Sequence, residues 1–109
     1  EMMIMNIFLD DTRPAPKNFI LIKSGEKLIH FLSKNTENIE LISLDHDLGA
    51  GLSGYDTIKI LINEYPFVFN KIHCIKIHSS NFVGAENMKL YIKNAIGCHI
   101  ITSSVKLSD

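Results

Sequence analysis

The chain has 109 residues, of which 46% are hydrophobic and 21% are charged. This size and composition are typical of one compact domain with its own apolar core, so we expect a single domain over residues 1–109. The formal net charge of −1 at pH 7 excludes a general attraction to nucleic acid backbones or anionic membranes, and no broad nucleic-acid-binding surface is expected.

The first half of the chain predicts two strands, a helix and a further strand. Residues 3–9 form a nearly continuous apolar run, as expected for a central parallel strand that is covered on both faces. Residues 18–23 are more polar and fit an edge strand. Ser24 can cap a helix whose apolar residues repeat at helical spacing from Leu28 onward. Residues 41–44 return to the pattern of a buried strand.

The second half continues the alternation of helices and strands. A helical pattern follows Gly54 and ends at Pro66. Residues 72–77 form another apolar run, and a last helical pattern follows Gly84. Residues 99–102 then fit a second edge strand.

This alternation predicts an α/β domain. We expect a single doubly wound, mainly parallel, five-stranded sheet with helices on both faces. In such sheets ligands bind beyond the carboxyl ends of the strands, at the point where the winding order switches. The architecture locates a site, but many unrelated enzymes share it, so it identifies no reaction.

Acidic residues follow two of the expected central strands. Asp10 and Asp11 come after the first strand, and Asp45 and Asp47 come after the strand over 41–44. Several carboxylates at one rim are unfavourable unless a cation or protons compensate. Carboxylate oxygens are ligands that Mg2+ and Mn2+ prefer, so the four acids predict a divalent metal site. Each single aspartate can instead be a cap of the helix or turn that follows it.

Two histidines follow the ends of neighbouring strands. His46 lies between Asp45 and Asp47, and His78 opens the segment HSSN at residues 78–81. A histidine in such a place can act as general acid, general base or metal ligand, and two of them beside carboxylates favour a catalytic role. The remaining histidines fall within helix or strand patterns and are taken as structural or surface residues: His30, His73 and His99.

Several donors near these residues can bind an anion. Arg13 lies just beyond the acid pair, where its guanidinium can bind a phosphate or form a salt bridge that holds the loop. Ser79 and Asn81 offer hydroxyl and amide donors, and the helix start after Gly84 adds backbone N–H groups. Asn87 is a further candidate for substrate binding, although a polar residue in a first turn is often merely exposed.

Other chemistries lack support in the sequence. No Ser-His-Asp order, HExxH or CxxC pattern appears, which argues against acyl transfer, zinc proteolysis and thiol redox reactions. The two cysteines, Cys74 and Cys98, are far apart, and we expect both to be reduced. No apolar stretch is long enough to span a bilayer, so a cytoplasmic protein without membrane contact is expected. Of the chemistries considered, the sequence supports phosphate chemistry around a bound cation.

Four motifs, taken together, resemble one known family. They are FLDDTRP at residues 8–14, SLDHDLG at 43–49, GYD at 54–56 and HSSNFVGAENM at 78–88. In this combination and order the chain is similar to the cyclic-phosphate processing receiver domain family over nearly its whole length. The resemblance implies the receiver fold of response regulators, which we expect to lack its last helix here.

The resemblance also implies roles for individual residues. Asp10 and Asp11 would stand in the place of the acid pair that holds a divalent cation. Asp45 would occupy the phosphoacceptor position and Ser79 the hydroxyl position on the next strand.

Departures from a signalling receiver favour an enzyme over a switch. A signalling receiver normally places a lysine at the end of its last strand, whereas residues 99–104 occupy the corresponding stretch here and Lys106 is out of register. An ordinary receiver also lacks four residues that this chain adds, which are of the types that bind metal or move protons during hydrolysis: His46, Asp47, His78 and Asn81.

Three functions therefore stand as hypotheses. The first is a phosphoesterase that uses Mg2+ or Mn2+ to open a cyclic phosphate on a nucleotide or at an RNA end, with Asp45 as a metal ligand or a nucleophile. The second is a stand-alone phosphoacceptor switch that docks on a partner protein when Asp45 is phosphorylated. The third is a module that binds a cyclic nucleotide without turnover.

Overall fold

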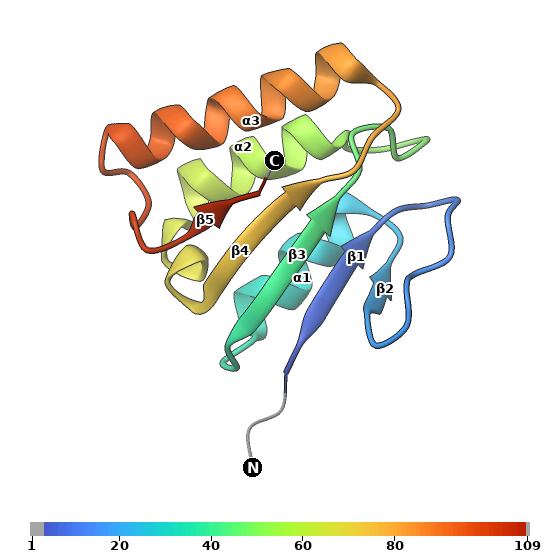
Figure 1. The fold of residues 1–109 in the computed structure, drawn as a ribbon, viewed down its shortest axis with the longest axis horizontal. Coiled ribbons are helices and arrows are strands. Elements are labelled where there is room, and N and C mark those ends of the chain that lie inside the picture. Colours follow the sequence, from blue (N-terminus) through green and yellow to red (C-terminus); the bar gives the residue numbers. More distant parts are fainter. Residues whose placement is uncertain (1–3, 109) are drawn as a thin grey trace.

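Five parallel strands form one sheet in the order β2-β1-β3-β4-β5, in a computed structural model that describes residues 4–108 (Figure 1). β1 has β2 on one side and β3 on the other, so the winding order switches at β1. The sheet confirms the predicted receiver-like α/β fold. The strands are β1 (Asn6–Leu9), β2 (Ile20–Ile22), β3 (Ile39–Leu44), β4 (Ile72–Ile77) and β5 (Lys106–Leu107).

Each α-helix begins at a polar side chain that caps it. Oγ of Ser24 accepts a hydrogen bond from the N–H of Lys27, which starts α1 (Gly25–Lys34). Ser53 caps α2 (Gly54–Glu64) in the same way, and Asn81 caps α3 (Phe82–Gly97). Such caps satisfy backbone donors that have no partner within the helix, so the polar residues after the loops set where the helices start. A 3-10 helix, η1 (Pro66–Lys71), leads from α2 into β4.

All three α-helices cover the same face of the sheet, which corrects the prediction of helices on both faces. Side chains from this face and from α1, α2 and α3 form one buried cluster, and α2 lies between α1 and α3 (Figure 1). The crossovers from β2 to β3, β3 to β4 and β4 to β5 all run in one direction across the sheet. Crossovers of one hand then place every helix on one side.

The opposite face of the sheet carries no helix among residues 4–108. The connection from β1 to β2 contains Pro14 and Pro16 and has no helix, and the described chain ends one residue after β5. We expected the fold to lack its last helix, whereas a long final helix, α3, is present before β5. No helix in the described part is long and apolar enough to cross a membrane.

The last strand lies later in the chain than predicted. Residues 99–102 were expected to form it, but they make the turn that ends α3, and β5 is at Lys106–Leu107. His99 has a φ of 60°, and the N–H groups of Ile100 and Ile101 both donate to the carbonyl oxygen of Ala95. Residues with positive φ do not continue a strand, so this segment caps the helix instead. The edge strand predicted at 18–23 is confirmed by β2, while Met3 of the first run lies outside the described residues.

Candidate functional site

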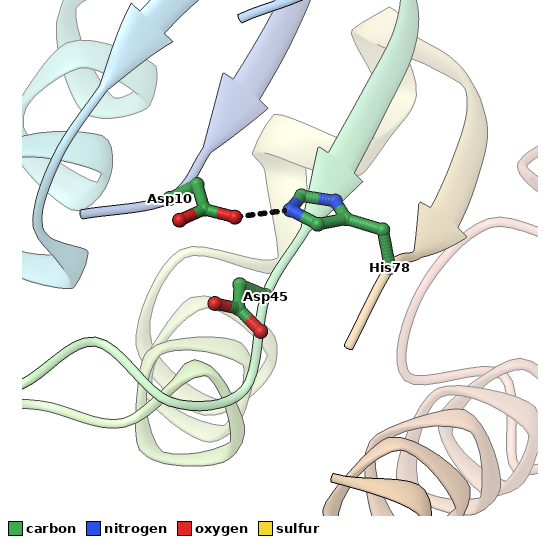
Figure 2. A group of neighbouring side chains, drawn as sticks. All are labelled: Asp10, Asp45 and His78. Carbon is green, nitrogen blue, oxygen red and sulfur yellow. Dashed lines mark hydrogen bonds and ion pairs between the residues drawn. The ribbon is translucent and has the colours of Figure 1, made fainter. Parts of the chain in front are cut away.

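Three strands deliver polar side chains to one point at the carboxyl edge of the sheet. Asp10 follows β1, Asp45 follows β3 and His78 follows β4 (Figure 2). The N–H of Asp45 donates to the carbonyl oxygen of Leu9, and the N–H of His78 donates to that of Leu44, at 3.0 and 2.9 Å. The hydrogen-bond ladder therefore continues past the strand ends and holds the three residues level. One potential ligand atom from each lies within 4.8 Å of the others.

Asp10 is fully buried and accepts hydrogen bonds on both carboxylate oxygens. Oδ1 accepts from the backbone N–H groups of Thr12 and Arg13, each at 2.9 Å, and Oδ2 lies 2.9 Å from Nε2 of His78. Burial raises the pKa of this carboxyl, but the hydrogen bonds from Arg13, Thr12 and His78 outweigh it and lower the pKa to about 2. Asp10 is therefore a carboxylate at any physiological pH.

His78 is held between a carboxylate and a hydroxyl. Its Nε2 faces Oδ2 of Asp10, its Nδ1 lies 2.6 Å from Oγ of Ser43, and its ring stacks on Phe8 with 4.1 Å between centroids. Because ionised Asp10 has no proton to give, Nε2 of His78 is the donor. In the neutral imidazole Nδ1 then accepts the proton of the Ser43 hydroxyl. The arrangement is a hydrogen-bonded line from Ser43 through His78 to Asp10.

The sequence did not predict this line. The three residues occur along the chain in the order Asp10, Ser43, His78, which differs from the orders of the known Ser-His-Asp triads. Ser43 was treated as part of a buried strand. The available signal was a serine that interrupts the apolar run over 41–44. Because successive residues of a strand face opposite sides of the sheet, Ser43 lies on the other face from Leu44.

Asp45 has one free carboxylate oxygen. The residue is only 6% exposed, and its Oδ1 accepts the N–H of His46 at 2.8 Å. Within residues 4–108 its Oδ2 accepts no hydrogen bond. Two carboxylates, Asp10 and Asp45, thus come together as the oxygen donors that suit Mg2+ and Mn2+, so the residues fit a divalent cation.

His46, Asp47 and Asn81 form a second cluster beside the first. Nδ1 of His46 lies 2.7 Å from Oδ1 of Asp47, and the side-chain amide of Asn81 donates to the same oxygen at 3.3 Å. These hydrogen bonds, from His46 first and then from Asn81, lower the pKa of the Asp47 carboxyl. Asp47 is exposed and lies outside the group made by Asp10, Asp45 and His78. In this arrangement it orients His46.

The ring of His46 lies against the start of α3. A Cβ atom on Gly84 would come 2.6 Å from the ring, so only glycine leaves room for it there. Asn81 binds the cluster to the helix, because its Oδ1 caps Gly84 while its amide reaches Asp47. The first turn of α3 therefore positions His46.

The remaining predicted site residues lie outside the group made by Asp10, Asp45 and His78. Asp11 is half-buried and its Oδ2 lies near Gly49 rather than in the three-residue group. Arg13 lies at the rim, 46% exposed, with NH1 at 3.4 Å from Asp10 and 3.5 Å from the carbonyl oxygen of His78. Oγ of Ser79 accepts the N–H of Asn81. Asn87 is exposed in α3, and no described residue of the site hydrogen-bonds to it.

Within residues 4–108, the last strand places no lysine at this rim, unlike that of a signalling receiver. Lys106 is exposed and lies beside Cys74, three residues before the last residue of β4. Of the other histidines, His30 and His73 are exposed on α1 and β4, as predicted, whereas His99 lies in the turn after α3.

The sequence model of the cyclic-phosphate processing receiver domain matches residues 5–94. This range includes both clusters described above, from Asp10 to Asn81. No curated protein sequence and no solved structure shows a significant match to the chain.

Proposed function

The chain belongs to the cyclic-phosphate processing receiver domain family, and on this basis we propose that it is a metal-dependent phosphoesterase that opens a cyclic phosphate of a nucleotide or an RNA end. The observation that carries the proposal is the meeting of two carboxylates and a histidine at the switch point of the sheet. One of these carboxylates, Asp10, is buried and remains ionised.

Asp10 and Asp45 are the residues that would hold Mg2+ or Mn2+. The cation would polarise the phosphoryl oxygens and make a bound water more acidic. The free oxygen of Asp45 supports this role, and it would equally serve a nucleophile that forms an aspartyl phosphate. Asp11 adjoins Asp10 and stays a candidate for a further ligand, whereas the hydrogen bond of Asp47 to His46 favours an orienting role.

His46 is the better placed of the two histidines to exchange a proton with substrate. Both ring nitrogens of His78 are engaged, by Asp10 and Ser43, whereas Nε2 of His46 has no hydrogen-bond partner among the described residues. In ring opening, water would attack phosphorus and one P–O bond to the ribose would break. His46 would take the proton of the water or give one to the departing oxygen, with His78 as the second proton-transfer group.

The groups at the rim would orient the phosphoryl oxygens. The guanidinium of Arg13 is nearly half exposed and keeps donors beyond those that face Asp10. The hydroxyl of Ser79, the amide of Asn81 and the first turn of α3 would supply further donors. Asn87, exposed further along α3, stays a more distant candidate.

The test is turnover of a panel of 2',3'-cyclic, 3',5'-cyclic and cyclic oligonucleotide substrates with Mg2+, Mn2+ or EDTA. We expect turnover that EDTA abolishes, and that Asp45→Asn and His46→Ala each lower kcat by at least about 100-fold. Asp56→Asn and His73→Ala are matched controls, because both residues are exposed and lie outside the two clusters. Turnover that survives EDTA and Asp45→Asn would contradict the proposal.

A phosphoacceptor switch at Asp45 is the second candidate. The receiver-like strand order and the position of Asp45 directly after β3 favour it. Its signature would be a stable aspartyl phosphate formed from acetyl phosphate, with no substrate of the panel cleaved. The lysine of the last strand, Lys106, lies level with Cys74 and not at the rim, which weighs against it.

A further inference from the structure

The helix-free face of the sheet begins at the candidate site. Phe8, Ser43 and Lys76 are register partners on β1, β3 and β4 and lie side by side on this face. Their chain neighbours, such as Leu9 and Leu44, point to the opposite face and into the core beneath the helices. A side chain on the helix-free face can therefore meet a ligand that comes down from the rim.

A pocket of about 470 Å3 occupies the upper part of this face. Its volume falls within the range of small-molecule sites, ~300–1,000 Å3. The pocket extends from His78 at the rim down to Leu41 in β3. Leu41 lies four residues before Asp45, which corresponds to roughly 13 Å along the strand. The loop between β1 and β2 forms one wall through Pro16 and Phe19.

The lining of the pocket fits an anionic ligand with a flat apolar part. It includes two cations, Arg13 and Lys76, and no carboxylate. Phe8 and Phe19 meet edge to face, with centroids 6.2 Å apart, and both line the pocket. Aromatic rings are surfaces on which nucleobases stack, and cations beside them bind phosphates.

The pocket is continuous with the site described above. His78, Ser79 and Arg13 belong to both. Lys76 is in β4, two residues before His78, and therefore lies about 7 Å from the rim along the strand. A phosphate at the rim and a second phosphate at Lys76 would therefore be separated by roughly the length of one nucleoside unit lying in the pocket.

We propose that this pocket binds the nucleoside next to the reacting phosphate, with its base against Phe19 and a second phosphate, on the far side of the ribose, at Lys76. The inference rests on the proposed function for the identity of the first phosphate. Such a pocket would select substrates that carry a phosphate on both sides of the nucleoside, as a nucleotide within a nucleic acid chain does. The two cations and the absence of acids favour this ligand over an apolar protein segment.

Binding of stable ligands tests the pocket without turnover. A nucleoside 3',5'-bisphosphate, the matching 3'-monophosphate and inorganic phosphate are titrated separately into the 15N-labelled protein, and shifts in its amide spectrum give Kd. The bisphosphate is expected to bind about fivefold to tenfold more tightly than the monophosphate. Lys76→Gln should remove this difference, and Phe19→Ala should weaken both nucleotides by at least about fivefold.

Two variants serve as matched controls. Lys106→Gln removes an exposed lysine from the same face of the sheet, outside the pocket, and should keep the preference for the bisphosphate. Phe67→Ala removes an exposed phenylalanine from η1 and should change neither affinity. The same spectra show whether each variant is folded.

Three results would overturn the inference. They are a wild-type protein that binds none of the ligands, inorganic phosphate binding as tightly as the nucleotides, and a preference for the bisphosphate that survives Lys76→Gln. Turnover of cyclic substrates is measured in parallel. If the predicted binding holds without turnover, the pocket stands and the phosphoesterase proposal fails; if turnover occurs while the binding predictions fail, the reverse is true.

Discussion

At the scale of single residues, Asp10 anchors the site. Its carboxylate accepts hydrogen bonds from Thr12 and Arg13, in the loop after β1, and from His78. Its side chain is fully buried, so its charge is compatible with the fold only because these donors surround it. The loop and the histidine thus depend on one ionised group.

Asp10 makes the stability of the protein sensitive to acid. Its pKa falls from an ordinary value of 3.8 to about 2 on folding. A carboxyl with a lowered folded-state pKa stabilises the protein above its unfolded pKa, here by ~2 kcal/mol, and this contribution is lost as the pH falls toward 2. Urea unfolding in EDTA at pH 6 and pH 3 should show that Asp10 contributes ~1 kcal/mol less at the lower pH.

The control for this prediction is Asp10→Asn, which removes the titrating group but keeps the size of the side chain. Its free energy of unfolding should fall less than that of the wild type between the two pH values. An equal fall in both proteins would mean that other groups account for the acid sensitivity.

Ser43 is a positioning residue for His78. Its Oγ lies 2.6 Å from Nδ1 of His78, and the residue is 4% exposed, so Ser43→Ala leaves that nitrogen without its partner. An unsatisfied buried group costs ~1–3 kcal/mol, and the free energy of unfolding should fall by about that amount. The 15N shifts of the imidazole should also show a smaller fraction of the tautomer protonated at Nε2.

Ser33→Ala is the matched control for Ser43→Ala. Ser33 donates to the carbonyl oxygen of His30 on the surface of α1, and it belongs to neither cluster of the site. Its loss should change neither the tautomer nor turnover. Unaltered 15N shifts in Ser43→Ala would show that Asp10 alone sets the tautomer of His78.

At the scale of elements, the first turn of α3 connects helix packing to the second cluster. Gly84 is buried against the ring of His46, and Asn81 caps the helix while it binds Asp47. The glycine is required here by close approach, because any Cβ would meet the ring. The position of α3 along its axis therefore controls where His46 lies.

Gly84→Ala separates helix stability from site geometry. Alanine is favoured over glycine inside a helix by ~1 kcal/mol, but its Cβ would come 2.6 Å from the His46 ring and must displace it. We expect the variant to remain folded while kcat for cyclic-phosphate opening falls at least tenfold, a loss of ~1.4 kcal/mol. Thermal unfolding and steady-state kinetics measure the two effects.

The same helix offers a control for this variant. A Cβ on Gly97, at the other end of α3, would have no atom within 4 Å. Gly97→Ala should leave turnover unchanged. If Gly84→Ala were as active as Gly97→Ala, the ring of His46 would have no fixed role.

At the scale of the whole molecule, the fold is a receiver-like sheet whose helices, within residues 4–108, all lie on one face. The helices bury the side chains of Leu9 and Leu44, while Phe8 and Ser43 on the other face remain available to the pocket. A helix between β1 and β2 would be expected to cover that face, because its crossover runs in the opposite direction across the sheet. Replacing it by a loop is what leaves the pocket open.

Much of this arrangement was predictable from the chain. The apolar runs at 41–44 and 72–77 predicted β3 and β4, and the predicted cap Ser24 stands where α1 begins. Since parallel strands end at one edge, Asp10, Asp45 and His78 could be expected to converge. The strand predicted at 99–102 is wrong because His99 adopts a positive φ in the turn that ends α3, which the pattern of polar and apolar residues does not report.

Most of the elements, the parallel sheet and the edge at which the acids gather were predictable from residue type and order alone, because local periodicity and the rule for parallel strands depend on nothing else. The hydrogen bonds that these groups share depend on the tertiary structure. It joined Ser43 to His78, separated Asp47 from Asp10 and placed all helices on one face. These outcomes depend on strand order and on the alternation of side chains across a paired sheet, which exist only once distant segments have met.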